Sequence, residues 1–271
     1  MSATADFGHQ SQHTAIEALN DAVLEVTDLM SPPCLMAGSA NPGYGTPNWE
    51  MLQRWFALPA EDDGPFWALN LMKYRAVAAY TDGNESGVSG KDADDAYAPL
   101  GPLAAVGALV AFHGDVVEQR LGDPAWDRIG IVRYPTRAAF FEMQRRDDFK
   151  DQHVHKEAGM EFTIVMSCLP AGSPGDGAAS DRLVLAVTRG GPVDVAAVDG
   201  ADPVADFTVE GVIVGDERSF DRATFVTVRD DAALDAVVGA VRHADDAHVL
   251  VVDRAIDRLV DSVLSASEAG R

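Results

Sequence analysis

The chain has 271 residues, of which 47% are hydrophobic and 24% charged, and its formal net charge is -22. This length suits one large domain or two small ones, and the composition is typical of a soluble globular protein. So acidic a surface repels phosphate groups, which excludes nucleic acid and anionic membrane as favoured partners. No apolar run could span a bilayer and the first residues lack signal-peptide features, so we expect a cytoplasmic protein.

Residues 1–64 are predicted to form an N-terminal helical extension. Apolar residues recur at helical spacing over 14–30, where Thr14 and Glu17 form a capping box. A loop rich in Gly and Pro follows, and a short helix is predicted over 48–58. Cys34 and Cys168 lie far apart in apolar settings, so we expect two reduced thiols rather than a disulfide.

The pattern changes at residue 65, where a strand over 66–75 is predicted. Trp67, Leu69 and Leu71 share one face of this strand, and Asn70 lies among apolar residues on the other. A buried polar side chain needs a hydrogen-bond partner. Asn70 therefore indicates either a pocket or a purely structural hydrogen bond.

Residues 65–170 read as strand, helix, strand, strand, helix, strand. After a Gly-rich loop, a helix is expected from Ser89 or Asp92 to about 106, and strands over 108–117 and 127–134. Thr136 caps the next helix and an Asp at 147 or 148 begins another, which ends before Gly159. A strand over 161–168 completes the order, which is that of a ferredoxin-like unit.

Residues 171–181 form a small-residue linker, and residues 182–271 repeat the order of elements. Strands are expected over 182–188, 206–214, 222–228 and 248–253, and helices near 192–199, 231–242 and 255–265. Trp126-Asp127-Arg128 aligns with Phe220-Asp221-Arg222, and in the same register Thr136 aligns with Asp230. We therefore predict an α+β fold of tandem ferredoxin-like units (βαββαβ twice) that form an α/β-barrel pseudo-dimer.

The two units differ in chemistry, because every Trp, Tyr and Lys precedes residue 157. The first unit is therefore expected to hold the site and the second to be structural. The sequence leaves open whether the barrel closes within a monomeric pseudo-dimer or in a homodimer.

Four segments of the first unit resemble the dimeric α/β-barrel proteins: the strand FWALNLMKYR, the helix DAYAPL, the strand end AFHGD, and WDRIGIVRYPTRAAFFEMQRRDDFKDQHVHKEAGME. The most similar subgroup is the family named domain of unknown function 1330, and the resemblance covers about residues 65–170. It implies that two ferredoxin-like units pack sheet against sheet and enclose a pocket. Such proteins include cofactor-free monooxygenases, isomerases, lactonising enzymes and haem proteins, so the fold does not determine the activity.

Histidine and tyrosine side chains of the first unit are candidates for proton transfer, since histidine titrates near neutral pH. His155 also suits the negative end of a helix, and the arginines also suit pairing with the many acids. The predicted catalytic residues are His155, His113 and Tyr134, and the predicted substrate-binding residues are Asn70, Tyr97, Arg137 and Arg128.

His153 and His155 are the pair that would suggest a metal site. On a helix, residues two apart point about 200° away from each other and cannot chelate one ion. The segment favours a helix, so we predict no metal and no cofactor. The alternatives are a site in which one of these histidines binds a metal together with His113 or an acid, and an axial haem ligand.

We therefore expect a small-molecule enzyme that performs cofactor-free proton transfer in an apolar pocket, of an isomerase, cyclase or monooxygenase-like kind. The alternative is a non-catalytic ligand-binding or stress-associated barrel protein, and the third option is a haem- or metal-dependent barrel enzyme. The expected partner is a small-molecule ligand.

Overall fold

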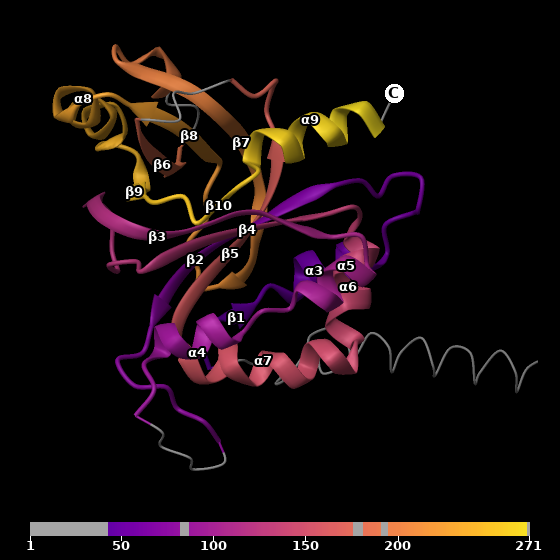
Figure 1. The fold of residues 1–271 in the computed structure, drawn as a ribbon. Helices are drawn as coiled ribbons and strands as arrows, with labels where there is room; N and C mark the ends of the chain where they lie inside the picture. Colours follow the sequence, from indigo (N-terminus) through magenta and orange to yellow (C-terminus); the bar gives the residue numbers. More distant parts are fainter. Residues whose placement is uncertain (1–42, 82–86, 176–180, 191–194, 270–271) are drawn as a thin grey trace, which may run out of the picture.

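A computed structural model describes residues 43–81, 87–175, 181–190 and 195–269 (Figure 1). The helix predicted over 14–30 lies outside the described residues, as does part of the Gly-rich loop. The elements of the first half are β1 Thr46–Pro47, α3 Trp49–Phe56, β2 Phe66–Tyr74, α4 Gly90–Ala96, α5 Leu100–Ala105, β3 Leu109–Leu121, β4 Arg128–Tyr134, α6 Arg137–Arg145, α7 Asp147–Gly159 and β5 Met160–Pro170. Those of the second half are β6 Arg182–Arg189, the 3-10 helix η1 Val195–Ala197, β7 Ala201–Gly215, β8 Arg222–Val228, α8 Asp231–Val241, β9 Asp245–Val252, β10 Ile256–Asp257 and α9 Leu259–Ala269.

Eight strands close into an antiparallel barrel, in the order β5-β2-β4-β3-β9-β6-β8-β7 with β7 returning to β5. The two halves join twice. Val116 of β3 pairs with Val252 of β9, and Val165 of β5 pairs with Val214 of β7. Closure gives every strand of the ring two hydrogen-bonded neighbours, which removes exposed sheet edges. A single chain thus completes the barrel, and the α+β prediction is confirmed.

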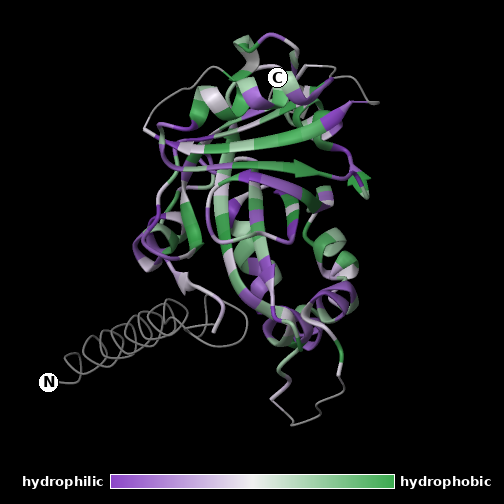
Figure 2. Cartoon of the chain, turned by 90° about the vertical axis from the view of Figure 1, so that its left-hand side faces the viewer, coloured by the Kyte–Doolittle hydropathy of each residue, from purple (hydrophilic) through white to green (hydrophobic). Residues whose placement is uncertain are grey.

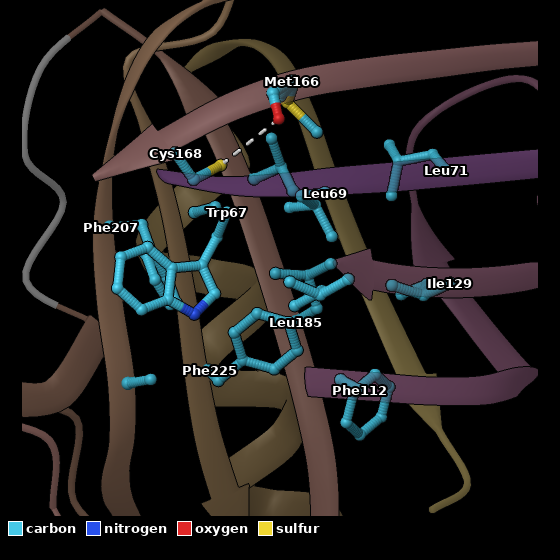
Figure 3. Close-up of a cluster of buried hydrophobic side chains, with 14 of the residues drawn as sticks. Trp67, Leu69, Leu71, Phe112, Ile129, Met166, Cys168, Leu185, Phe207 and Phe225 are labelled. Carbon is cyan, nitrogen blue, oxygen red and sulfur yellow. Dashed lines mark hydrogen bonds between the residues drawn. The ribbon is translucent and has the colours of Figure 1, made fainter. Parts of the chain in front are cut away.

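The barrel interior is filled by side chains from both halves. Trp67, Leu69 and Leu71 of β2 point inward, as their alternation predicts. They belong to one buried cluster with Leu185, Phe207 and Phe225 of the second half (Figure 3). The Trp67 indole N–H donates to Ser262 Oγ at 2.8 Å, which ties α9 to the interior. Burying each large apolar side chain contributes roughly 1.5–3 kcal/mol, so this cluster stabilises the joined halves.

Helices cover the outer faces of the barrel. Helices α3, α5, α6 and α7 pack on the first half and α8 on the second (Figure 1). Polar side chains cap them: Thr136 Oγ1 accepts from Ala139 N at 3.0 Å, and Asp230 Oδ1 accepts from Ala233 N at 2.9 Å. The barrel strands are largely green in Figure 2, the colour of hydrophobic residues, and most residues of β2, β4, β6 and β8 are buried.

Several element boundaries differ from the sequence-based expectations. The helix expected up to residue 106 is divided into α4 and α5 around Pro99, which cannot donate a backbone hydrogen bond. The strand that begins at Leu109 continues to Leu121, beyond the expected end at residue 117, because it pairs with β9. The last helix begins at Leu259 because Ile256 pairs with His113 in a short strand. Among the described helices, none has the length and apolar character needed to cross a membrane.

Candidate functional site

A cavity of about 310 Å³ lies mainly in the first half, between the outer face of the sheet and the helices that cover it, and Ile213, Val214 and Ile256 of the second half also line it. This volume suits a small molecule. Most of its lining is apolar, with side chains such as Leu103, Phe140, Met143, Phe149 and Val165. The polar and titratable residues that line it are Tyr44, Asn70, Asp94, Asp95, Tyr97, His113, Arg128, Tyr134, Gln144, His153 and Lys156.

The strands β2 and β4 form the floor of the cavity, where a glycine lies beside Asn70. Asn70 lies on the outer face of β2, as its alternation predicts, and its cross-strand partner is Gly130 of β4. A Cβ atom at Gly130 would lie 3.2 Å from Met72 Cε and 3.9 Å from His113 Cδ2. The glycine therefore leaves the floor open beside Asn70. The Asn70 amide nitrogen donates to Ala68 O at 3.0 Å, which directs its oxygen Oδ1 for another contact.

Helix α7 contributes a buried histidine to the cavity wall. His153 Nε2 lies 2.9 Å from the Tyr44 hydroxyl, and within the described part of the chain His153 Nδ1 has no hydrogen-bond partner. Burial, with a smaller effect of Lys156, lowers the pKa of His153 to about 3. Burial also raises the pKa of Tyr44 well above its usual range. His153 is therefore a neutral imidazole at physiological pH.

Lys156 follows His153 by three residues and lines the same cavity, because residues three apart share a helix face. Its Nζ lies 3.5 Å from Asn70 Oδ1, 6.0 Å from the ring centre of Tyr44 and 5.6 Å from that of Tyr97. Burial lowers the pKa of Lys156, and Asp94 opposes that shift. Within the described residues its amine makes no ion pair. The aromatic rings of Tyr44 and Tyr97 flank it, where a lysine more often has a carboxylate.

Two further tyrosines and a histidine line the cavity. The Tyr97 ring meets His153 edge-on at a centroid separation of 5.9 Å. The Tyr134 hydroxyl donates to Met143 Sδ at 3.3 Å, and its ring stacks on Phe66. Burial raises the pKa of both tyrosines. Burial, together with the positive charge of Arg128, lowers the pKa of His113.

Arg128 belongs to a buried charge network at one end of the cavity. Its Nε donates to Asp115 Oδ1 at 2.7 Å, and its Nη1 donates to Asp94 Oδ2 at 3.0 Å and to Asp95 Oδ1 at 2.7 Å. The Tyr74 hydroxyl also donates to Asp94 Oδ2, at 2.5 Å. The guanidinium is thus matched by carboxylates already present in the chain, and the network fixes α4 against the strands.

Two of the predicted site residues do not line the cavity. His155 Nδ1 lies 2.9 Å from the Tyr80 hydroxyl, because residues two apart on α7 point to different sides. Arg137 Nη2 donates to Glu210 Oε2 at 2.8 Å, and its guanidinium lies over the Trp55 ring. Its position at the start of α6 turns it toward Asp63, whose carboxylate accepts from the first backbone N–H groups of that helix.

The structure brings together Asn70, Tyr97, His113, Arg128 and Tyr134, which the sequence proposed, and adds residues that the prediction left out. His153 and Lys156 could have been found from their shared helix face. Tyr44 and Asp94 carry no comparable signal, since Tyr44 lies in a Gly- and Pro-rich segment and Asp94 in an acidic run. Across the residues that the structure describes, no three His, Cys, Asp or Glu side chains gather as a metal site would require.

No protein-family model matches the chain, and no curated protein matches it significantly. Similar solved structures include a protein of unknown function from Rhodopseudomonas palustris, which is 29% identical over 48% of this chain and 98% of its own, with a TM-score of 0.41. A proposed monooxygenase from Lactobacillus acidophilus is 14% identical over 70% of this chain and 94% of its own, with a TM-score of 0.36. Chlorite dismutase from Candidatus Nitrospira defluvii is 9% identical over 75% of this chain and 95% of its own, with a TM-score of 0.42. The resemblance to the dimeric α/β-barrel proteins and to the family named domain of unknown function 1330 stays a prediction.

Proposed function

We propose that this chain is a small-molecule enzyme that transfers protons without a cofactor in the cavity of its first half, as an isomerase, cyclase or monooxygenase-like enzyme. One observation carries the proposal. Tyr44 and His153 lie within hydrogen-bond reach of each other, with Lys156 on the same helix face, in a largely apolar cavity. Titratable groups that converge in such a cavity are the usual machinery of general acid–base catalysis.

The groups have complementary roles. The neutral imidazole of His153 and the amine of Lys156, whose pKa burial lowers, offer nitrogen atoms, and the Tyr44 and Tyr97 hydroxyls offer O–H groups. Apolar walls hold the body of a substrate, while Asn70 offers a polar contact at one end. A low local dielectric strengthens each of these interactions relative to water. His113 and Tyr134 are further candidates for proton transfer at the same cavity.

We also propose that the two halves are tandem ferredoxin-like units that form a pseudo-dimer. Support comes from the order of strands in the sheet, which is β5-β2-β4-β3 in the first half and β9-β6-β8-β7 in the second. In both halves, the strands lie side by side in the order fourth, first, third, second of that half. Support also comes from hydrogen bonds: Arg128 Nε donates to Asp115 Oδ1 in one half and Arg222 Nε to Asp206 Oδ1 in the other, each at 2.7 Å. The two units differ at the cavity, because its aromatic, amine and imidazole groups all belong to the first half.

The test measures proton exchange rather than one product. Small ketones and aldehydes with exchangeable α protons are incubated with the protein in heavy water, and deuterium uptake is followed by NMR. Wild type should exceed buffer for some members of the panel. Lys156→Met and Tyr44→Phe should each lower the rate by about 100-fold or more, because each removes a proton-transfer group.

Lys150→Met is the matched control. Lys150 lies on the same helix, is about half exposed and pairs with Asp147, so its loss should leave exchange unchanged. Saturable binding of panel members with exchange no faster than in buffer would contradict catalysis and favour the ligand-binding alternative. A haem absorption band or a stoichiometric metal in the purified protein would favour the third option.

A further inference from the structure

We propose that Lys156 is a nucleophile that captures a small apolar aldehyde or ketone as an imine. The proposal rests on the proposed proton-transfer function of the cavity and names its substrate class, a carbonyl compound without a large polar group. It starts from the position of the amine, which is the only lysine nitrogen at the cavity among the four lysines of the chain, all of them within the described residues.

The other three lysines have different surroundings. Lys91 Nζ lies 2.9 Å from Asp115 Oδ2, and Lys150 Nζ lies 3.3 Å from Asp147 Oδ1. Lys73 Nζ donates to the backbone oxygen of Ala125 at an exposed site. A neighbouring carboxylate favours the ammonium form, which has no lone pair to attack a carbonyl carbon. Lys156 instead makes no ion pair within the described residues and meets a neutral amide oxygen at 3.5 Å, and burial lowers its pKa more than the charge of Asp94 raises it.

The walls beside Lys156 suit a neutral electrophile. The faces of Tyr44 and Tyr97 flank its amine, and apolar side chains make up most of the remaining lining. A lysine desolvated in an apolar pocket carries more free amine than one in water, and the pKa of Lys156 is lowered for this reason. The cavity has about 310 Å³ of space for the carbonyl compound.

The reaction is balanced without any further reagent. The lone pair of Nζ attacks the carbonyl carbon, a C–N bond forms, and the π electrons move to the oxygen. One proton passes from nitrogen to that oxygen, which gives a carbinolamine. The nitrogen lone pair then forms the C=N bond as the hydroxyl leaves with a second proton as water. Tyr44 and His153, which lie 2.9 Å apart, are placed on the same wall to relay these protons.

Imine formation also explains why proton-transfer groups surround the amine. A protonated imine withdraws electrons from the neighbouring carbon, so an α proton leaves more readily than from the free carbonyl compound. The neutral imidazole of His153 is an acceptor for that proton. Hydrolysis by water returns the amine and the carbonyl compound.

The test traps the imine on each lysine of the wild-type protein. Benzaldehyde or acetophenone is added with sodium cyanoborohydride, and the four lysines are compared by peptide mass spectrometry. Lys156 should be labelled roughly ten-fold or more faster than Lys150, as a desolvated amine is a better nucleophile at neutral pH. The label at Lys156 should also saturate with probe concentration and reach one per chain.

Two variants complete the design, with folding checked by circular dichroism. Lys156→Arg should abolish the fast label, because a guanidinium forms no imine under these conditions, and Lys150→Arg should retain it. Labelling of Lys156 no faster than of Lys150 in the wild type would overturn the imine, and this comparison does not depend on any variant folding.

The trapping and exchange measurements separate the two proposals. Deuterium exchange without selective trapping would overturn the imine and leave proton transfer standing with Lys156 as a simple base. Selective trapping without exchange would support the imine and remove the proton-transfer function.

Discussion

The Tyr44 hydroxyl lies 2.9 Å from Nε2 of His153, although the two residues are 109 positions apart in the chain. A second pair of the same kind lies on the other side of helix α7, where the Tyr80 hydroxyl is 2.9 Å from His155 Nδ1. Helix α7 therefore contributes the histidine of two tyrosine–histidine pairs, one in the cavity and one outside it. The outer pair is a natural control for the inner one.

Removal of the inner hydroxyl should destabilise the protein. In Tyr44→Phe, a buried His153 nitrogen loses its partner, and an unsatisfied buried polar group costs about 1–3 kcal/mol. Tyr80→Phe should cost less, because Tyr80 and His155 are only partly buried and water can replace the lost contact. Urea unfolding measures both, and equal losses in the two variants would contradict the importance of burial at His153.

Stability should depend on the charge of His153. Its pKa is about 3 in the folded chain and about 6.5 when unfolded, so between these values the unfolded state binds the proton more readily. The free energy of unfolding should therefore be fully present above about pH 6.5 and decrease as the pH falls toward 3, by up to about 1.4 kcal/mol per pH unit. His153→Gln should reduce this slope in urea unfolding between pH 4.5 and 7.5.

His248 provides an independent comparison in the second half. Burial, with a contribution from Arg218, lowers its pKa to about 4, and it lies 3.3 Å from the Trp126 indole nitrogen. His248→Gln should reduce the pH slope of the free energy of unfolding over a window from about 6.5 down to about 4, and the double variant should reduce it further.

For the His153 prediction, a slope unchanged from wild type in His153→Gln would show that its imidazole titrates equally in the folded and unfolded states.

The Arg128 network should be among the most sensitive polar sites. The side chains of Arg128 and Asp94 are 4% and 5% exposed, so Arg128→Met leaves a buried carboxylate without its cation. Breaking one partner of such a pair costs about 3–5 kcal/mol. Arg54→Met is the matched control, since its pair with Glu50 is exposed, and it should change little. A small loss in Arg128→Met would mean that Tyr74 and water satisfy Asp94 alone.

Phe112 and Phe225 should be energetically coupled across the barrel. Their ring centres are 5.8 Å apart, one ring coming from each half of the chain. A double-mutant cycle with Phe112→Leu and Phe225→Leu should give a coupling of about 0.5–1.5 kcal/mol, the range for aromatic pairs. Strict additivity of the two substitutions would contradict direct packing between the halves.

Local patterns predicted much of this architecture. Alternation along β2 placed Trp67 and Leu69 inside the barrel and Asn70 on the outer face, and the structure confirms each. Thr136 caps its helix as predicted, and Asp230, which aligns with it, caps α8. Helical spacing also indicated that His153 and His155 could not act together. These features follow from periods of 2.0 and 3.6 residues, which the sequence displays directly.

Sequence alone thus determined the α+β class, the order of most of the elements and the placing of every Trp, Tyr and Lys before residue 157. Only the tertiary structure decided which of them share the cavity. Helical spacing separates His153 from His155, but packing of α7 against the sheet determines that His153 faces inward. Tyr44 reaches His153 across 109 residues, and Arg128 meets Asp94 across 34. Such contacts arise from burial and packing between distant segments, which no local period records.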